Sequence, residues 1–233
     1  MTLSLLHVQP ATGTVAALTA TGGVAVGGYV HHAWRGLGAC ATQGLATNPW
    51  YSEAVHTALA EPKSAEQALA RVVETDPGAG RRQCLVMDRQ GLAAVHSGDD
   101  NLPVVAAVCR PTVAAAGNML ADADVVDILL YRFLEGACIN AEAAWQEVEP
   151  PRYRDDYETR LPEILVKALE AALGAGGDGR GTRSAALRVE SFSAAPIDIR
   201  VDWAENPAAE LRTLLERVRE PTFADFLASL PSR

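Results

Sequence analysis

Thr2 is the residue whose type and position first suggest chemistry. Bacterial processing normally removes Met1 when a small residue follows, which would leave Thr2 with a free α-amine. The reference pKa of an α-amine is about 7.7–8.0, so part of it is unprotonated at neutral pH and can accept the hydroxyl proton of the same residue, directly or through a water. A strand starting at Thr2 would hold this geometry rigidly. The position predicts a nucleophilic threonine, and trimming without catalysis is the alternative.

The Gly-rich segment at 174–184, GAGGDGRGTRS, is the most conspicuous local motif. A phosphate-binding P-loop runs from a strand into a helix and carries Lys after its last Gly. This segment runs from a predicted helix into a predicted strand and has Thr182 at that place. The pattern therefore argues against nucleotide binding and favours a helix-to-strand turn or a loop that lines a site.

The remaining histidines and acids favour structural roles. His31 and His32 are adjacent, so on a strand they point to opposite faces and cannot easily share one metal; we expect surface or edge positions. The acidic sets at 99–100, 122–127 and 155–156 lack the spacing of a calcium loop and are expected to be solvated or to cap helices. The chain also lacks the Gly-x-Ser-x-Gly elbow of serine hydrolases. We predict no metal and no cofactor.

The cysteines are too widely spaced for a zinc site or a small disulfide framework, and buried reduced thiols are expected. They are Cys40, Cys84, Cys109 and Cys138. The N-terminus lacks a basic segment and a cleavage site, and no apolar run is long enough to span a membrane. We therefore expect a cytoplasmic protein without a membrane partner.

The composition supports a globular chain and argues against nucleic-acid binding. Apolar residues make up 48%, charged residues 21% and aromatic residues only 6%, and the net charge is −9. Binding to phosphates needs a basic stripe, and none is visible. The chain contains 42 alanines and 19 glycines, so its core must gain burial from close packing of small side chains. No linker or repeat interrupts it, and we expect one domain over residues 1–233.

The hydrophobic pattern predicts the elements that must position Thr2. Alternation predicts strands near 2–9, 14–20, 24–30, 36–42, 83–88, 92–96, 104–109, 185–190 and 197–202. Helical spacing predicts helices near 50–60, from Ser64 to about residue 75, within 124–145, at 161–173 and at 207–218. Ser64 and Gln67 have the spacing of a capping box. Strands and helices come in groups rather than in strict alternation, which favours an α+β fold with antiparallel sheets.

Several segments, taken together and in order, resemble one family. They are Met1-Thr2-Leu3-Ser4-Leu5, Pro10-Ala11-Thr12-Gly13, Ala25-Val26-Gly27, Gly36-Leu37-Gly38-Ala39-Cys40-Ala41-Thr42-Gln43, Thr47-Asn48-Pro49-Trp50-Tyr51, Gly117-Asn118-Met119-Leu120, Gly176-Gly177-Asp178 with Arg180-Gly181 and Ser184-Ala185-Ala186-Leu187, and Ile197-Asp198-Ile199-Arg200-Val201-Asp202. Nearly the whole chain resembles the bacterial and archaeal proteins catalogued as domain of unknown function 1028, which are grouped with the N-terminal-nucleophile (Ntn) hydrolase fold.

The resemblance implies a four-layer αββα sandwich and an amidohydrolase in which an N-terminal hydroxyl attacks a carbonyl. Carried onto this chain, it implies Thr2 as the nucleophile, with Thr21, Gln43, Asn118 and Asp178 as candidates for contacting the substrate or the oxyanion. Relatives commonly have Ser-Lys or Ser-Arg where this chain has Thr21-Gly22, so that position lacks a cation here.

Two functions stay open on this basis. The first is an Ntn-type hydrolase of a small-molecule or peptide amide, with cell-wall peptides or amino sugars suggested by relatives that carry a peptidoglycan-binding domain. The second is a catalytically inactive binding or assembly protein on the same fold. Homo-oligomerisation is expected on general grounds.

Overall fold

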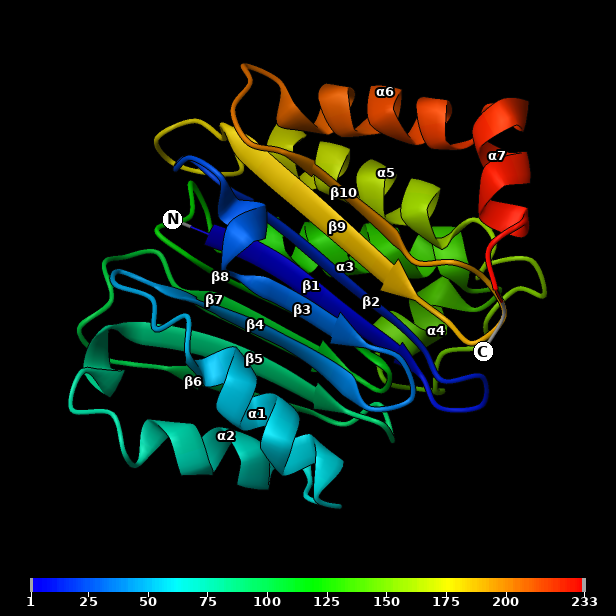
Figure 1. Cartoon of the computed structure of the whole chain (residues 1–233). Coiled ribbons are helices and arrows are strands. Elements are labelled where there is room, and N and C mark those ends of the chain that lie inside the picture. The colour runs from blue at the N-terminus through cyan, green and yellow to red at the C-terminus, as the bar shows by residue number, and fades with distance from the viewer. Residues whose placement is uncertain (1, 232–233) are drawn as a thin grey trace.

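Two antiparallel sheets and seven α-helices make up the structured part of the chain, a mixed α/β fold, in a computed structural model that describes residues 2–231 (Figure 1). The six-stranded sheet, called sheet A, has the order β10-β9-β2-β1-β8-β7. Its strands are β1 (Thr2–Gln9), β2 (Thr14–Thr21), β7 (Ala106–Arg110), β8 (Val113–Asn118), β9 (Ser184–Glu190) and β10 (Ile197–Val201). β1, which begins at Thr2, is therefore a central strand.

The second sheet, called sheet B, comes from one continuous stretch of sequence. Its order is β3-β4-β5-β6, with β3 (His31–Trp34), β4 (Gly38–Gly44), β5 (Arg82–Asp88) and β6 (Ala93–Ser97). Short apolar residues of both sheets, among them Leu6, Ala17 and Leu85, meet in a buried core that we call the inter-sheet core. Alanine and valine dominate this core, as expected for a chain that buries small side chains.

The helices cover the outer faces of the two sheets. A large core joins sheet A to α3 (Asp124–Ala137), α5 (Leu161–Gly174) and α6 (Pro207–Val218), and a third core joins sheet B to α1 (Tyr51–Ala60) and α2 (Ala65–Val73). α4 (Ala141–Trp145) follows α3, and α7 (Pro221–Ala228) extends from α6. In Figure 1, α1 and α2 lie beside sheet B, and α3, α5 and α6 lie beyond sheet A.

Most predicted elements are confirmed, and two of the expected elements are wrong. The strand predicted at 24–30 is a 3-10 turn over Val26–Gly28, because Ala25 has a left-handed backbone and Gly27 packs closely against Ala186. The segment at 124–145 is two helices, because Cys138 is extended and bridges to Tyr153.

The expected surface or edge position of the histidine pair is only half correct. β3 is an edge strand of sheet B, but the His31 side chain is buried, with 7% of its surface exposed. His31 lies on the same face of β3 as Ala33, which belongs to the inter-sheet core. Burial, followed by the nearby charges of His32, Arg188 and Arg200, lowers the pKa of His31 to about 3. The ring is therefore neutral at ordinary pH.

The thiols match the expectation from their spacing. Cys40, Cys84 and Cys138 are buried, Cys109 is half-buried, and all four are free.

Candidate functional site

Thr2 lies at the start of β1, on the side of sheet A that faces sheet B. Leu6 and Val8 of the same strand belong to the inter-sheet core, and alternate residues of a strand share a face, so Thr2 and Ser4 point the same way. Only 8% of the Thr2 surface is exposed. The hydroxyl of Thr2 is thus held in a restricted space between the two sheets.

The strands on either side bring two of the predicted residues next to Thr2. Thr21 of β2 and Asn118 of β8 are its direct register partners, so the three side chains stand in a row across the sheet. The Thr2 Oγ1 donates to Thr21 Oγ1 at 3.4 Å, a long hydrogen bond. Cross-strand pairing therefore accounts for why residues so distant in sequence meet here.

Gln43 reaches Thr2 from the opposite sheet. Its Nε2 donates to the main-chain oxygen of Thr2 at 3.3 Å and to that of Ala116 at 3.2 Å, and its Oε1 accepts from the Ser4 hydroxyl at 2.7 Å. Gln43 lies in β4 on the same face as Ala39 and Ala41, both in the inter-sheet core. This end of the inter-sheet space is polar, whereas the rest is apolar.

Asp178 approaches the same end of sheet A from the Gly-rich segment. Its side chain is fully buried and accepts the backbone N–H of Gly22, the residue after Thr21. It also accepts two hydrogen bonds from the Arg180 side chain, from Nε to Oδ1 and from Nη2 to Oδ2, both at 3.2 Å. Figure 1 shows this loop, which runs from α5 to β9, at the same end of sheet A as the start of β1.

A cation, Arg180, binds the carboxylate that contacts Gly22, and the sequence motifs alone do not predict this pairing. Position 22 is glycine, but the guanidinium of Arg180 holds the carboxylate that Gly22 contacts. A side chain at position 22 would not fit, because a Cβ there would lie 2.5 Å from Asp178 Oδ2 and 2.8 Å from the Gly181 oxygen. The five predicted residues are therefore all gathered around the start of β1.

Gln83 is the residue of this cluster that sequence reasoning missed. Its Oε1 accepts from Gln43 Nε2 at 2.7 Å and from Asn118 Nδ2 at 3.0 Å. A signal existed: Gln83 is the polar member of an inward-facing series whose other members are Leu85 and Met87. A buried glutamine at such a position needs polar partners, and this need points to the cluster.

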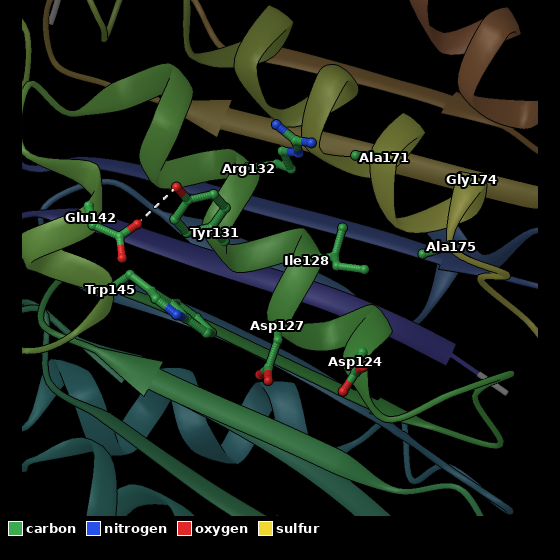
Figure 2. A pocket seen from close by; sticks show the side chains of 10 residues that line it. All are labelled: Asp124, Asp127, Ile128, Tyr131, Arg132, Glu142, Trp145, Ala171, Gly174 and Ala175. Atoms are coloured by element: carbon green, nitrogen blue, oxygen red, sulfur yellow. Dashed lines mark hydrogen bonds between the residues drawn. The ribbon is translucent and has the colours of Figure 1, made fainter.

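Two cavities of the structure lie away from this cluster. The larger one, of about 750 Å³, opens between α3, α4 and α5, as Figure 2 shows. Its lining includes Asp124, Asp127 and Trp145, and Tyr131 donates to Glu142 at 3.1 Å across one side. A smaller cavity of about 160 Å³ lies beside Glu158 and Ser191. Neither is lined by Thr2 or by the residues around it.

Within residues 2–231, no group of three or more His, Cys, Asp and Glu side chains is arranged to hold a metal ion. No helix in the same range has the length and apolar character needed to cross a membrane.

Comparison with known proteins identifies a family and solved structures that align with this chain. A model described as a family of unknown function, DUF1028, matches residues 2–211. The crystal structure of a Silicibacter pomeroyi protein that carries the same family designation is 29% identical, with a TM-score of 0.83, over 99% of this chain and 92% of that one. Anbu (ancestral beta-subunit) of Yersinia bercovieri aligns at 8% identity with a TM-score of 0.38, over 100% of this chain and 99% of that one. No curated protein matches.

Proposed function

This chain belongs to the DUF1028 family, and on that premise we propose that it is an N-terminal-nucleophile amidohydrolase. The proposed substrate is a small-molecule or peptide amide. We further propose that the protein is cytoplasmic, that its chain forms one Ntn-like domain, and that it assembles into a homo-oligomer.

The proposed fold is the four-layer αββα sandwich of Ntn hydrolases. Its support is the division of the buried side chains into three cores, one between the sheets and one on each outer sheet face. In this arrangement Thr2, at the start of the central strand β1 of sheet A, directs its side chain into the space between the two sheets.

One observation carries the catalytic part of the proposal. Thr2 is the first residue of a central strand, and its hydroxyl contacts Thr21 while its main-chain oxygen accepts from Gln43, in a space that is otherwise apolar. After removal of Met1, its α-amine takes the proton from its hydroxyl, and Oγ1 attacks the amide carbonyl. The strand pairing on both sides restricts the motion of this nucleophile, which favours attack.

The neighbouring residues take supporting roles in this proposal. Thr21 orients the hydroxyl of Thr2 through the contact between their Oγ1 atoms. Gln43 and Asn118 form the polar wall on the inter-sheet side. Asp178 fixes the backbone at Gly22 and holds Arg180, whose positive charge lies at the edge of the site.

The experiment has two steps. Intact mass of protein purified from its native host shows whether Met1 is removed, and a chain that always keeps Met1 rules out the free-amine mechanism. A panel of N-acyl amino acids, dipeptides and cell-wall peptide amides is then assayed with the wild type and with Thr2→Ala. We expect hydrolysis of at least one amide by the wild type and a loss of at least about a hundredfold in Thr2→Ala.

Thr213→Ala is the matched control, because Thr213 is exposed on α6 and its hydroxyl contacts only the backbone of its own helix. It should hydrolyse the same amide at the wild-type rate. Equal activity of Thr2→Ala and the wild type would exclude Thr2 as the nucleophile.

The second candidate is a catalytically inactive binding or assembly protein on the same fold. A specific observation favours it: the Thr2 side chain is nearly buried, with 8% of the residue's surface exposed, which restricts access to its hydroxyl. In that case no amide of the panel is hydrolysed by protein that has lost Met1.

A further inference from the structure

Three buried side-chain amides, those of Gln43, Gln83 and Asn118, form a cluster between the sheets beside Thr2. We call them the amide cluster. At most 2% of the surface of each is exposed. An amide presents donors at its nitrogen and acceptors at its oxygen, so the partners around the cluster decide which atom of each amide points where.

The orientation of Gln83 is fixed by main-chain carbonyls. Its Nε2 lies 3.3 Å from the Ala106 oxygen and 3.0 Å from the Gly117 oxygen, as well as 3.0 Å from Ser97 Oγ. Carbonyl oxygens only accept, so a flipped Gln83 would place its own oxygen against two acceptors. Its Oε1 must therefore face the other two amides.

The orientation of Asn118 follows from that of Gln83. Asn118 directs Nδ2 to Gln83 Oε1 at 3.0 Å, and a flip would bring two oxygens together. Its Oδ1 is thus turned away from Gln83. This atom is buried and has no hydrogen-bond partner, although nearly all buried polar atoms in folded proteins have one. The amide cluster therefore fixes the position of an acceptor atom, Asn118 Oδ1, that has no hydrogen-bond donor.

Thr2 is the residue opposite Asn118 in the sheet, and both side chains point into the inter-sheet space. Hydrolysis of the Met1–Thr2 peptide bond by an aminopeptidase consumes one water and leaves an α-amino group on Thr2. This group carries more N–H donors than the peptide it replaces, and buried donors need acceptors.

We propose that Asn118 Oδ1 accepts a hydrogen bond from the α-ammonium group of Thr2, and that Gln83 is the positioning residue that turns this oxygen towards it. The inference rests on the proposed function only in requiring that Met1 be removed. It gives Asn118 a role different from that of an oxyanion donor, because an oxyanion needs an N–H and the atom without a partner is an acceptor. Asn118 stabilises the protonated amine, and so it sets the pH above which the amine acts as a base.

The test measures the titration of the Thr2 α-amine by NMR, in a full chain that begins at Thr2 and carries ¹³Cα-labelled threonine. The chain is made by co-expression with a methionine aminopeptidase, which can act on the nascent chain, and its mass is checked. Thr2→Ser assigns the signal by removing it. We expect Asn118→Leu to lower the titration midpoint by about one pH unit, a tenfold change in the dissociation constant, because the ammonium loses its acceptor.

Gln83→Met keeps Asn118 but removes the oxygen that fixes the orientation of its amide. We therefore expect the titration midpoint of the Thr2 α-amine to fall by less than in Asn118→Leu. This variant decides the question if Asn118→Leu does not fold. Gln146→Met, on the exposed end of α4, should leave the midpoint unchanged.

An unchanged midpoint in both Asn118→Leu and Gln83→Met would overturn the inference. The readout does not depend on turnover, so it separates the two proposals. Thr2→Ala with full amide activity refutes the hydrolase mechanism, whereas an unmoved midpoint refutes the role of Asn118.

Discussion

Gly22 donates its backbone N–H to the side chain of Asp178, a residue 156 positions further along the chain. The contact joins the end of β2 to the loop before β9, and the Arg183 N–H, which donates to the Thr21 oxygen at 2.8 Å, reinforces it. The fit is close, because a Cβ on Gly22 would lie 2.9 Å from Asp178 Cγ. The edge of the candidate site therefore depends on a residue without a side chain.

Gly22→Ala should destabilise the protein by about 1–3 kcal/mol, because the added methyl group forces the Asp178 carboxylate and the Gly181 backbone apart. Urea unfolding of both forms measures the difference. Gly174→Ala is the matched control: Gly174 ends α5 and has open space around its missing side chain, so alanine should be neutral or slightly stabilising there. Equal effects of the two substitutions would show that the close fit at Gly22 is not the cause.

Asp178→Asn should destabilise the protein by about 2–4 kcal/mol. The substitution keeps the shape but removes the charge that Arg180 contacts. It also replaces one oxygen by an NH2 group that cannot accept, whereas Oδ2 accepts from Gly22 N–H and Arg180 Nη2 and Oδ1 accepts from the backbone N–H and Nε of Arg180. Asp198→Asn provides the comparison, because Asp198 pairs with Arg188 at the surface, where an ion pair contributes about 0–1 kcal/mol. The denaturant midpoints of the two variants should differ clearly, and similar midpoints would argue against a structural role for buried Asp178.

His7 should make the protein less stable in acid. Its Nδ1 lies 2.8 Å from the Thr112 oxygen and its Nε2 lies 3.2 Å from the Tyr157 hydroxyl, so the ring is buried among polar partners and the Phe133 ring. Burial lowers the pKa of His7 from 6.5 to about 4, against a smaller raising effect of the bond to Thr112.

Because the pKa of His7 is lower in the folded protein than in the unfolded chain, the free energy of unfolding falls as the pH falls. The unfolded chain takes up the proton first as the pH falls, so the contribution of His7 to stability is complete above about pH 6.5 and is lost between there and about pH 4. From neutral pH to about pH 5 the loss is about 2 kcal/mol. In His7→Gln the free energy of unfolding, from urea titrations, should fall less over this interval. His56→Gln, at an exposed position of α1, should keep the wild-type slope.

Ser64→Ala should destabilise α2 by about 1 kcal/mol. The Ser64 hydroxyl accepts from the Gln67 N–H at 3.2 Å, and the Gln67 side chain accepts from the Ser64 N–H at 3.1 Å, which completes a capping box. Ser64→Asp keeps an acceptor at the helix start and should restore most of the loss. Thermal unfolding compares the three forms, and equal melting of the alanine and aspartate forms would contradict a capping role.

The capping box shows what local sequence can predict. Ser64 and Gln67 interact with each other and with nearby backbone, so their spacing was sufficient, and the same is true of the hairpin of β1 and β2. The local pattern at 24–30 predicts a strand, whereas the turn at Val26–Gly28 has a distant cause: Gly27 packs against Ala186 and Arg200 from β9 and β10. α7 was not predicted, and none of its residues is buried.

The candidate site also depends on contacts between residues that are distant in sequence, which local patterns do not predict. Its residues were found one by one from motifs, but that Thr2, Thr21 and Asn118 stand in one row depends on the order of strands in sheet A. The contribution of Gln83 depends on the packing of one sheet on the other, because three of its acceptor or donor partners come from β7 and β8. A single sequence contains no direct record of such contacts.

The strand order of sheet A also concerns the time at which Met1 can be removed. Sheet B comes from residues 31–97, a stretch that the ribosome completes early, whereas β1 cannot pair with β8 until residue 118 has been synthesised. During that interval the amino terminus of the nascent chain lacks its neighbour on one side. We expect aminopeptidases to act in this window, because pairing with β8 and the arrival of sheet B leave Thr2 only 8% exposed.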